Sequence, residues 1–367
     1  MLLQGIKVVE LGQVYAGPYA GSIFADLGAE VTKIERPGGG DDARKMGLPF
    51  EDGDAFVFHV FNRGKKSVTL DLKVPADAKY FHELISDTDI FVHNVRPDVV
   101  DKLGVSSSEL CRHNPSLIYC AISAFGHVGP MAQMPGYEPL MQAFSGLSSV
   151  NGGPEDPPMR SAVSLCDLGS GMWVVIGALA MLHRRQNTGK GGVLTTSLLE
   201  TALTWNAQKS DSYINERKIP EKSRSGHPGF VPYEAFETAD RPLLICCGND
   251  RLFAKLAQEL GQEEWITLPQ FATNQARLEN KEQLMDVLVP IIQNKPRDEW
   301  LNRFQTVGIP CSPINTIPEA LEHPQVRALE QCVTVPGTAI KLTALPLTID
   351  THRPRPKSIA PVFIDKA

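Results

Sequence analysis

The sequence predicts an α/β protein built on a doubly wound, largely parallel sheet, and two features lead to this prediction. Residues 5–36 form a β-α-β pattern, with an apolar strand at Ile6–Leu11, a helix at Tyr19–Leu27 and a second strand at Glu30–Glu35. A unit of this kind is the building block of doubly wound sheets. Strands and helices then keep alternating through residue 123, which is typical of parallel strands joined by helices.

The following elements are predicted from hydrophobic pattern and turn residues. Ser67–Lys73 alternates polar and apolar residues, which predicts a strand with one face in water. Two continuous apolar segments predict buried strands at Ile90–Asn94 and Leu117–Ser123. Three helices are expected between the strands, the last with Ser106 and Glu109 as a capping box, at Ala76–Ser86, Pro97–Leu103 and Ser106–His113.

Glycine- and proline-rich loops separate the elements after residue 123. We expect a helix at Tyr137–Val150, a strand at Val193–Leu198, a helix at 199–209 and then an aperiodic segment at 210–232. A second unit begins near residue 233. Its predicted elements are a strand at Pro242–Cys247, helices at Asp250–Leu260, Glu279–Gln293, Arg297–Thr306 and Pro318–Leu321, and an edge strand at Pro313–Thr316. The C-terminal segment predicts short strands and a tail.

Composition argues against several classes of protein. The formal net charge is −6, and no basic cluster suggests a nucleic-acid surface. The longest apolar run, Met172–Leu182, is shorter than the roughly 20 residues that cross a bilayer, so we expect no membrane span. We also recognise no secretory signal in the N-terminal residues. Seven scattered cysteines without a Cys-x-x-Cys pair fit free thiols in a reducing compartment, which predicts a cytoplasmic protein.

Two ligand classes are also not expected. The nine histidines show no metal-ligand spacing, so no metal site is predicted. The first β-α-β unit lacks the Gly-x-Gly-x-x-Gly loop of dinucleotide-binding proteins, although Glu35 ends its second strand. NAD is therefore not expected, and Arg36 instead offers a cation for a phosphate.

Asp167 lies at the junction between a stretch of small residues, Ser161–Gly171, and the long apolar run. An Asp just before a helix can cap its N-terminus, and the helix dipole favours the ionised form there. Gly169 and Gly171 would let a bulky ligand approach the carboxylate closely. These features leave two interpretations open, a structural N-cap or a carboxylate nucleophile that forms covalent intermediates.

An ordered series of motifs resembles the class III coenzyme A transferases, which share a fold with the 2-methylacyl-CoA racemases. From residue 4 to about 205 the motifs keep the family's order and spacing, at Gly5–Leu11, Tyr15–Tyr19, Leu27–Pro37, Asn62–Lys73, Asn94–Pro97, Asn114–Tyr119, Gly126–Pro130 and Thr188–Gly191. His227–Pro228, Cys247–Asp250 and Val307–Pro310 extend the resemblance into the second unit. Each motif alone is weak evidence for the family, whereas all of them together in this order are specific for it. Only the last 20 residues or so depart from the family pattern.

The resemblance implies a domain organisation and a partner. It implies a large, Rossmann-like, CoA-binding domain formed from both chain ends, residues 1–205 and 325–367. A linker at 206–232 and a smaller α/β domain at 233–324 complete the chain. Two chains of this family interlock, so the resemblance also implies an obligate homodimer.

The resemblance also implies a chemistry. The Asp at the position of Asp167 attacks the donor thioester, giving an anhydride and then an enzyme–CoA thioester, from which the acceptor acid takes the CoA. A coenzyme A thioester is the substrate, and no tightly bound cofactor is implied. The stretch Pro242–Phe253 looks like that of members handling small carboxylic or dicarboxylic acids. Oxalate with acetyl-, formyl- or succinyl-CoA is the leading expectation.

Site residues are carried over from the family position by position. Those implied to bind CoA are Val14, Tyr15, Ala16, Arg36, Leu70, Leu72, Lys73, Asn94, Val95, Arg96, Lys102 and Tyr137. Gln13 is implied near the reacting carbonyl, and His227 and Gly229 belong to a loop that covers the reacting centre in some members. For each cation an ordinary solvated surface residue is the competing interpretation, and for the 227–230 loop it is a plain linker turn.

Two other functions stay open beside the transferase. The racemases use an Asp at the same position as a base and pair it with the His of a Gly-His-Asp sequence. This chain has Gly136, Tyr137 and Glu138 there, so it lacks the second base of a two-base proton exchange. A non-catalytic CoA-binding subunit would form no covalent adduct on Asp167. We therefore favour the transferase.

Overall fold

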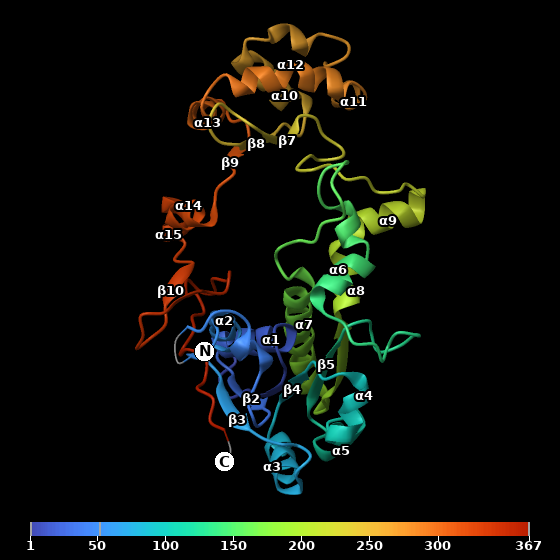
Figure 1. The fold of residues 1–367 in the computed structure, drawn as a ribbon, viewed down its shortest axis with the longest axis vertical. Helices are drawn as coiled ribbons and strands as arrows, with labels where there is room; N and C mark the ends of the chain where they lie inside the picture. Colours follow the sequence, from blue (N-terminus) through green and yellow to red (C-terminus); the bar gives the residue numbers. More distant parts are fainter. Residues whose placement is uncertain (1, 51–52, 366–367) are drawn as a thin grey trace. The chain divides into compact units, whose positions relative to one another are not determined.

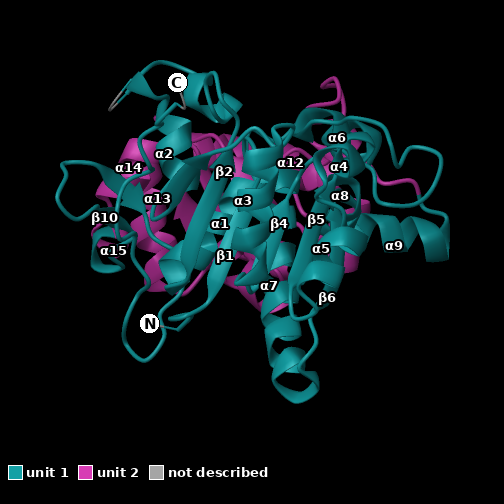
Figure 2. Ribbon diagram, turned by 90° about the horizontal axis from the view of Figure 1, so that it is seen from below, with its two compact units in different colours: residues 1–148, 160–218, 327–367 teal, residues 149–159, 219–326 magenta. Residues whose placement is uncertain are grey.

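The computed structural model describes residues 2–50 and 53–365 (Figure 1). The chain divides into two compact units, which are coloured separately in Figure 2. Unit 1 takes residues 1–148, 160–218 and 327–367, and unit 2 takes residues 149–159 and 219–326. Compared with the boundaries expected from the sequence, residues 206–218 lie with unit 1 and residues 149–159 lie with unit 2.

Unit 1 is built on a six-stranded parallel sheet, which confirms the predicted α/β fold. The strand order is β3-β2-β1-β4-β5-β6, the order of Rossmann-type sheets. The strands are β1 Lys7–Leu11, β2 Glu30–Glu35, β3 Lys66–Thr69, β4 Ile90–His93, β5 Ile118–Ser123 and β6 Gly192–Ser197. The order reverses between β1 and β4, and this is the place where open α/β sheets bind ligands.

Helices cover both faces of this sheet because successive side chains of a strand point to opposite faces. In β4, Ile90 and Val92 belong to a core shared with α1 (Ala16–Leu27) and α7 (Leu165–Thr188). Phe91 belongs to a second core, which it shares with α3 (Pro75–Ser86) and α5 (Ser107–His113). The two faces are therefore both buried, as expected of a parallel sheet.

The remaining helical segments up to residue 216 connect or flank the strands. They are η1 Asp42–Lys45, α2 Phe56–Asn62, α3 Pro75–Ser86, α4 Pro97–Val100, η3 Asp101–Leu103, α5 Ser107–His113, α6 Glu138–Phe144, η4 Leu147–Val150, α8 Leu198–Trp205 and α9 Ala207–Glu216. Near the C-terminus, β10 (Cys332–Thr334) and β11 (Lys341–Thr343) pair in an antiparallel hairpin, which confirms the short strands expected there.

Two local predictions in the first half of the chain are wrong. The strand expected up to Lys73 ends at Thr69, because the Asp71 carboxylate accepts a hydrogen bond from the Lys73 amide and forms a turn. Ser106 makes no capping hydrogen bond to α5, and its hydroxyl contacts that of Ser108. The predicted division into a wet and a dry face does not hold within β3, where Thr69 is buried and Val68 is half-buried, whereas Leu70 and Leu72 are buried beyond the end of the strand.

Two predicted helices are divided in the structure. The helix expected at Tyr137–Val150 separates into α6 and η4 around Gly146, whose φ of 83° is incompatible with a continuing helix. The helix expected at 199–209 separates at Asn206 into α8 and α9. Helix α9 then continues to Glu216, into the segment expected to lack periodic structure.

Unit 2 holds a three-stranded antiparallel sheet in the order β7-β8-β9. Its elements are β7 Tyr233–Phe236, β8 Leu243–Cys246, α10 Asp250–Leu260, η5 Glu263–Ile266, α11 Asn274–Glu279, α12 Lys281–Gln293, α13 Arg297–Thr306, β9 Cys311–Pro313 and α14 Ile317–Glu322. Helix α15 (Pro324–Ala328) crosses the unit boundary. Helices α10 and α13 match their predicted bounds, whereas β7 was not predicted and β9 lies earlier than the edge strand expected at Pro313–Thr316.

Helix α7 is longer than the apolar run that predicted it. With 24 residues it is long and apolar enough to cross a membrane by length and composition alone. One such helix is weak evidence, because core helices of soluble proteins meet the same criteria. Here Val174, Val175 and Ala178 are buried in the core that α7 shares with α1 and the sheet.

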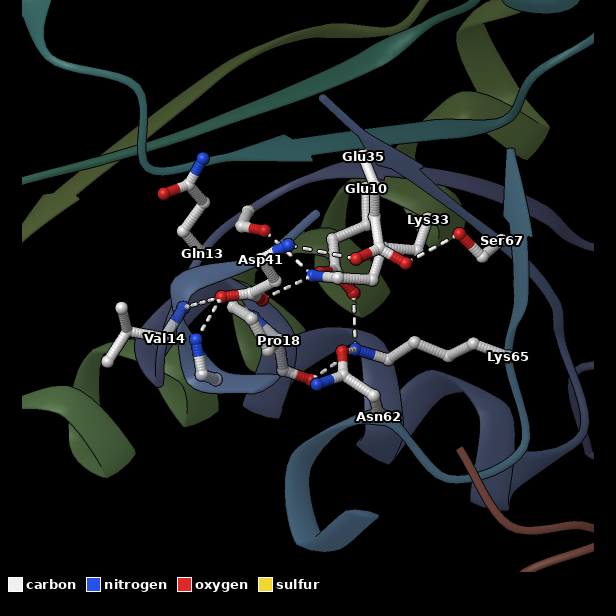
Figure 3. Close-up of polar contacts among 12 residues, drawn as sticks. Glu10, Gln13, Val14, Pro18, Lys33, Glu35, Asp41, Asn62, Lys65 and Ser67 are labelled. Carbon is white, nitrogen blue, oxygen red and sulfur yellow. Dashed lines mark hydrogen bonds and ion pairs between the residues drawn. The ribbon is translucent and has the colours of Figure 1, made fainter. Parts of the chain in front are cut away.

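A buried network of charges lies beneath the carboxyl ends of β1 and β2 (Figure 3). Glu10 and Lys33 are opposite each other in the sheet, and neither side chain is exposed to solvent. The Lys33 ammonium lies 2.9 Å from Glu10 Oε1 and 2.8 Å from Asp41 Oδ2. Lys65 lies 2.5 Å from Glu10 Oε2, so Glu10 bridges two buried cations.

Gly21 lets α1 approach this network closely. A Cβ atom at position 21 would lie 2.1 Å from Glu10 Oε2 and 3.0 Å from Lys65 Nζ. Neither group can move away without losing its ion pair, because each is fully buried. The sequence therefore needs glycine here although alanine is the better helix former.

We predict that Gly21→Ala lowers the free energy of unfolding by about 1–3 kcal/mol, the usual cost of overpacking a buried site. Urea denaturation measures this change. Gly248→Ala is the control, because its nearest non-neighbouring heavy atom to a Cβ would be 4.0 Å away. Equal stability of Gly21→Ala and the wild type would contradict the close approach.

Candidate active site at the sheet switch point

A cavity of about 730 Å³ opens at the carboxyl ends of the parallel strands, where the strand order reverses. Its walls come from the segments that follow the first five strands. Gln13 and Asn94 follow β1 and β4, and Arg36, Leu72 and Ala124 follow β2, β3 and β5. The volume lies within the range of small-molecule sites, and every lining residue belongs to unit 1.

The loop between β1 and α1 forms one wall of the cavity. Gln13 is held from both sides by Asn94, whose Oδ1 accepts the Gln13 amide and whose Nδ2 donates to the Gln13 carbonyl, both at 2.9 Å. Val14 has φ of 67°, an uncommon conformation for a β-branched residue. Its amide donates to Asp41 Oδ1 at 2.9 Å.

Asp167 lies in the first turn of α7 and lines the same cavity. Of the two interpretations left open by the sequence, the structural N-cap is wrong: Ser164 takes that position, and no side chain caps the helix. Burial, followed by the negative charge of Asp167, raises the pKa of Tyr15, which lines the same cavity. The Asp167 carboxyl group is thus free to face the cavity instead of the helix end.

Burial and a second carboxyl group weaken the acidity of Asp167. Partial burial, followed by the negative charge of Glu138, raises the pKa of Asp167 to about 7. These two effects outweigh the helix dipole, which was expected to favour the ionised form. Glu138 begins α6, is 4 % exposed and lines the cavity. Its Oε1 accepts a hydrogen bond from Gln142 at 2.7 Å, whereas its buried Oε2 has no hydrogen-bond partner among the described residues.

The two glycines beside Asp167 serve packing and not ligand access. A Cβ atom on Gly169 would lie 2.5 Å from Trp205 Nε1 on α8. A Cβ atom on Gly171 would lie 2.8 Å from the Ala16 carbonyl oxygen on α1. The glycines therefore bring α7 against two helices, and this contact places Asp167 beside the start of α1.

Most residues expected to contact CoA line this one cavity. These are Gln13, Val14, Tyr15, Ala16, Arg36, Leu70, Leu72, Lys73, Asn94, Val95, Arg96 and Tyr137, together with Asp167. Lys102 lies on the exposed surface of η3 outside the lining. His227 and Gly229 belong to unit 2 and are not among the lining residues. The individual roles of all these residues stay predictions.

The basic residues at the cavity differ in their pairing. Arg36 is paired with Asp42, and Arg96 lies 2.9 Å from Asp98. Lys73 is exposed and makes no ion pair within the described chain. No group of three or more His, Cys, Asp or Glu residues within 2–50 and 53–365 could hold a metal ion.

Comparison with known proteins decides the family. The family model described as CoA-transferase family III matches residues 3–363. The chain belongs to CoA-transferase family III. It is 35 % identical to an acetyl-CoA:oxalate CoA-transferase of Acetobacter aceti, covering 92 % of this chain and 88 % of that protein. It is 34 % identical to a succinate–glutarate CoA-transferase of Agrobacterium fabrum, covering 97 % and 92 %.

A solved structure agrees with this assignment. The fold is similar to a CaiB/BaiF family protein from Brucella suis, with a TM-score of 0.88 and 33 % identity over 98 % of this chain and 95 % of that one. The resemblance stated from the motifs is thereby confirmed, and this family III member is an enzyme. Sequence motifs did not single out Glu138, whose influence on Asp167 comes from the meeting of α6 and α7.

We predict that a CoA-transferase whose nucleophile is Asp167 loses activity as the pH falls through about 7, the pKa to which burial and Glu138 raise this carboxyl group. The ionised form attacks, so protonation removes it. Glu138→Gln removes one neighbouring negative charge and moves this acid limb to lower pH. The pH dependence of kcat/KM measures both, and an unshifted limb in Glu138→Gln would contradict the electrostatic role of Glu138.

Proposed function

We propose that this family III enzyme moves CoA from an acyl-CoA to a small carboxylic or dicarboxylic acid through covalent intermediates on Asp167. The observation that carries the proposal is the partly buried Asp167 carboxyl group, with its raised pKa, in the cavity at the sheet switch point. A carboxylate removed from water is a better nucleophile than a hydrated one.

The proposed cycle has four steps in which bonds and charges balance. An Asp167 oxygen attacks the thioester carbonyl carbon. The C–S bond breaks, CoA departs as a thiolate, and Asp167 and the donor acyl group are left joined as a mixed anhydride. The thiolate attacks the Asp167 carbonyl carbon and expels the donor acid as a carboxylate. The acceptor carboxylate then attacks the resulting aspartyl–CoA thioester and expels the thiolate. Attack of this thiolate on the acceptor's carbonyl carbon releases acyl-CoA and the Asp167 carboxylate.

The cavity supports a CoA ligand by its distribution of charge. Lys73, Arg36 and Arg96 are exposed basic residues in its lining, and we assign them to the phosphates of CoA. Leu70 and Leu72 are buried apolar residues of the same lining, suited to the adenine. Val14, Tyr15 and Ala16 would then contact the pantetheine arm on its way to Asp167. No step of the cycle calls for a further cofactor or a metal.

The acceptor class is proposed from the relatives and the chemistry together. The similar proteins named above transfer CoA to or from oxalate, or between succinate and glutarate, as their names state. Oxalate with acetyl-, formyl- or succinyl-CoA is the leading assignment for this chain.

The assembly and the cellular setting are part of the same proposal. We propose an interlocked homodimer of large and small domains that correspond to units 1 and 2. Exposed apolar side chains support a protein interface, since Leu140 and Phe144 on α6 and Ile176 on α7 are each more than half exposed. All seven cysteines are free, which supports a reducing, cytoplasmic compartment.

We predict a dimer in sedimentation equilibrium at micromolar concentration, because these apolar side chains are costly to leave in water. Leu140→Glu and Phe144→Glu together place two charges on the exposed side of α6 and are expected to raise the dimer's dissociation constant. Glu155→Lys, at an exposed position of unit 2, is the charge-changing control. A monomeric wild type at all concentrations would contradict the homodimer.

We predict a covalent acyl or CoA adduct on the peptide that holds Asp167 after incubation with acetyl-CoA or succinyl-CoA. Mass spectrometry with hydroxylamine or borohydride trapping measures it. Asp167→Ala should form no adduct and show no turnover, because the attacking oxygen is gone. Asp211→Ala, an exposed carboxyl group on α9 outside the cavity, is the matched control and should behave as the wild type.

Adding acceptors to the adduct-bearing enzyme, freed of excess donor and not treated with a trapping reagent, identifies the second substrate. Oxalate, glutarate and succinate are added separately, and release of the matching acyl-CoA is followed. No adduct with any donor, combined with α-proton exchange of a 2-methylacyl-CoA in deuterated water, would replace the transferase with a racemase. CoA binding without either reaction would leave a non-catalytic CoA-binding subunit.

A further inference from the structure

The wall of the cavity formed by Gly12–Tyr15 is held by side chains from three other segments. Lys33 Nζ donates to the Gly12 carbonyl at 2.8 Å. Asn94 binds the amide and the carbonyl of Gln13, and Asp41 Oδ1 accepts the Val14 amide. Figure 3 shows Asp41 between Val14 and Lys33, with hydrogen bonds or ion pairs to both.

Val14 makes this arrangement informative. A β-branched residue at φ 67° is held in a sparsely populated conformation and stays there only when its surroundings require it. The amide of Val14 has a charged, fixed acceptor in Asp41. A hydrogen bond to a buried carboxylate is about twice as strong as a neutral one.

Asp41 is itself fixed on three sides. Its Oδ2 lies 2.8 Å from the Lys33 ammonium, and its side chain is 1 % exposed. Its backbone amide donates to Glu35 Oε2 at 2.9 Å, and its Oδ1 also accepts the Ala43 amide. The carboxylate therefore cannot turn to follow the loop, and the loop must take the position that Asp41 sets.

We propose that Asp41 is a positioning residue of the transferase: by holding the Val14 amide it fixes Gln13 and Tyr15 against Asp167 in the cavity. The inference rests on the proposed function. Asp41 itself does not line the cavity, whereas Gln13, Tyr15 and Asp167 all do. Its effect on the reaction therefore passes through the backbone of the loop.

Asp41→Asn is the first variant to test, because it keeps the size of the side chain but replaces one of the two acceptor oxygens, which serve Val14 and Lys33, with an NH2 donor. We expect kcat and the single-turnover rate of Asp167 adduct formation to fall by about 10–100-fold, the loss typical of a displacement near 1 Å. KM for acyl-CoA should change by a smaller factor than kcat, because only the loop's contacts to the pantetheine arm are displaced and the cations assigned to the phosphates are untouched. The acid limb of the pH profile stays at its wild-type position, in contrast to Glu138→Gln.

Asp26→Asn is the matched control. Asp26 is a fully buried carboxylate of unit 1 that pairs with Arg63 at 2.7 Å and does not contact the loop. Asp26→Asn should lower the free energy of unfolding as Asp41→Asn does, and its folded fraction should keep the wild-type kcat. Asp41→Glu keeps the negative charge beside Lys33 but displaces the oxygen that accepts the Val14 amide. If Asp41→Asn does not fold, Asp41→Glu is tested in its place, and the same fall in kcat is expected.

Hydrogen exchange of the Val14 amide separates this inference from the proposed function. Exchange should be slow in the wild type and in Asp26→Asn and fast in the Asp41 variants, whatever reaction the enzyme performs. If the wild type forms no Asp167 adduct but this exchange pattern appears, the proposed function fails, whereas the hydrogen bond by which Asp41 holds the Val14 amide is confirmed. A wild-type adduct rate in folded Asp41 variants, a shifted pH limb, or equal rate losses in Asp26→Asn would overturn the positioning role.

Discussion

The buried pairing of Lys33 with Glu10 and Asp41 is the constraint on which the active-site end of the sheet depends. Burying an ammonium group costs several kcal/mol unless opposite charges and hydrogen bonds compensate for it. Here burial alone would lower the pKa of Lys33, and the two carboxylates outweigh it and raise the pKa above its ordinary value. One partner lies on β1 and the other in the loop after β2. The two chain segments that open the cavity are therefore fixed by one cation.

This constraint extends to the helices through glycine. Because Glu10 also pairs with Lys65, the charged layer fills the space beneath α1, and only Gly21 fits against it. Burial, against the attraction of Glu10, lowers the pKa of Lys65 to about 8. Helix α7 packs closely against α1 at Gly171. The position of Asp167 thus depends on two close contacts, that of α1 with the ion pairs in the sheet and that of α7 with α1.

The sequence predicted the elements well where the pattern is local. Glu30–Glu35, Asp250–Leu260 and Arg297–Thr306 carry their periodicity and their end residues within themselves, so their bounds match the structure. Pairings across the sheet leave no such pattern. Lys33 and Glu10 are 23 residues apart, and a charged residue in an apolar strand does not reveal its partner. The same holds for Glu138, whose effect on Asp167 depends on how two helices meet. Most of the site residues carried over from the family line the cavity, but the electrostatics of the cavity required the fold.

The raised pKa of Asp167 bears on the direction of the proposed cycle. The thiolate can attack either carbonyl carbon of the mixed anhydride. Attack on the donor's carbonyl expels Asp167 and returns to the start, whereas attack on the aspartyl carbonyl expels the donor acid and moves forward. A carboxylate that must re-form beside Glu138 in a partly buried site, with a pKa of about 7, is a poorer leaving group than an ordinary carboxylate. The pair of carboxyl groups thus costs some ionised nucleophile at neutral pH. It favours the forward partition of the first anhydride and opposes that of the second, from which Asp167 must leave, so it favours the aspartyl–CoA thioester that lies between them.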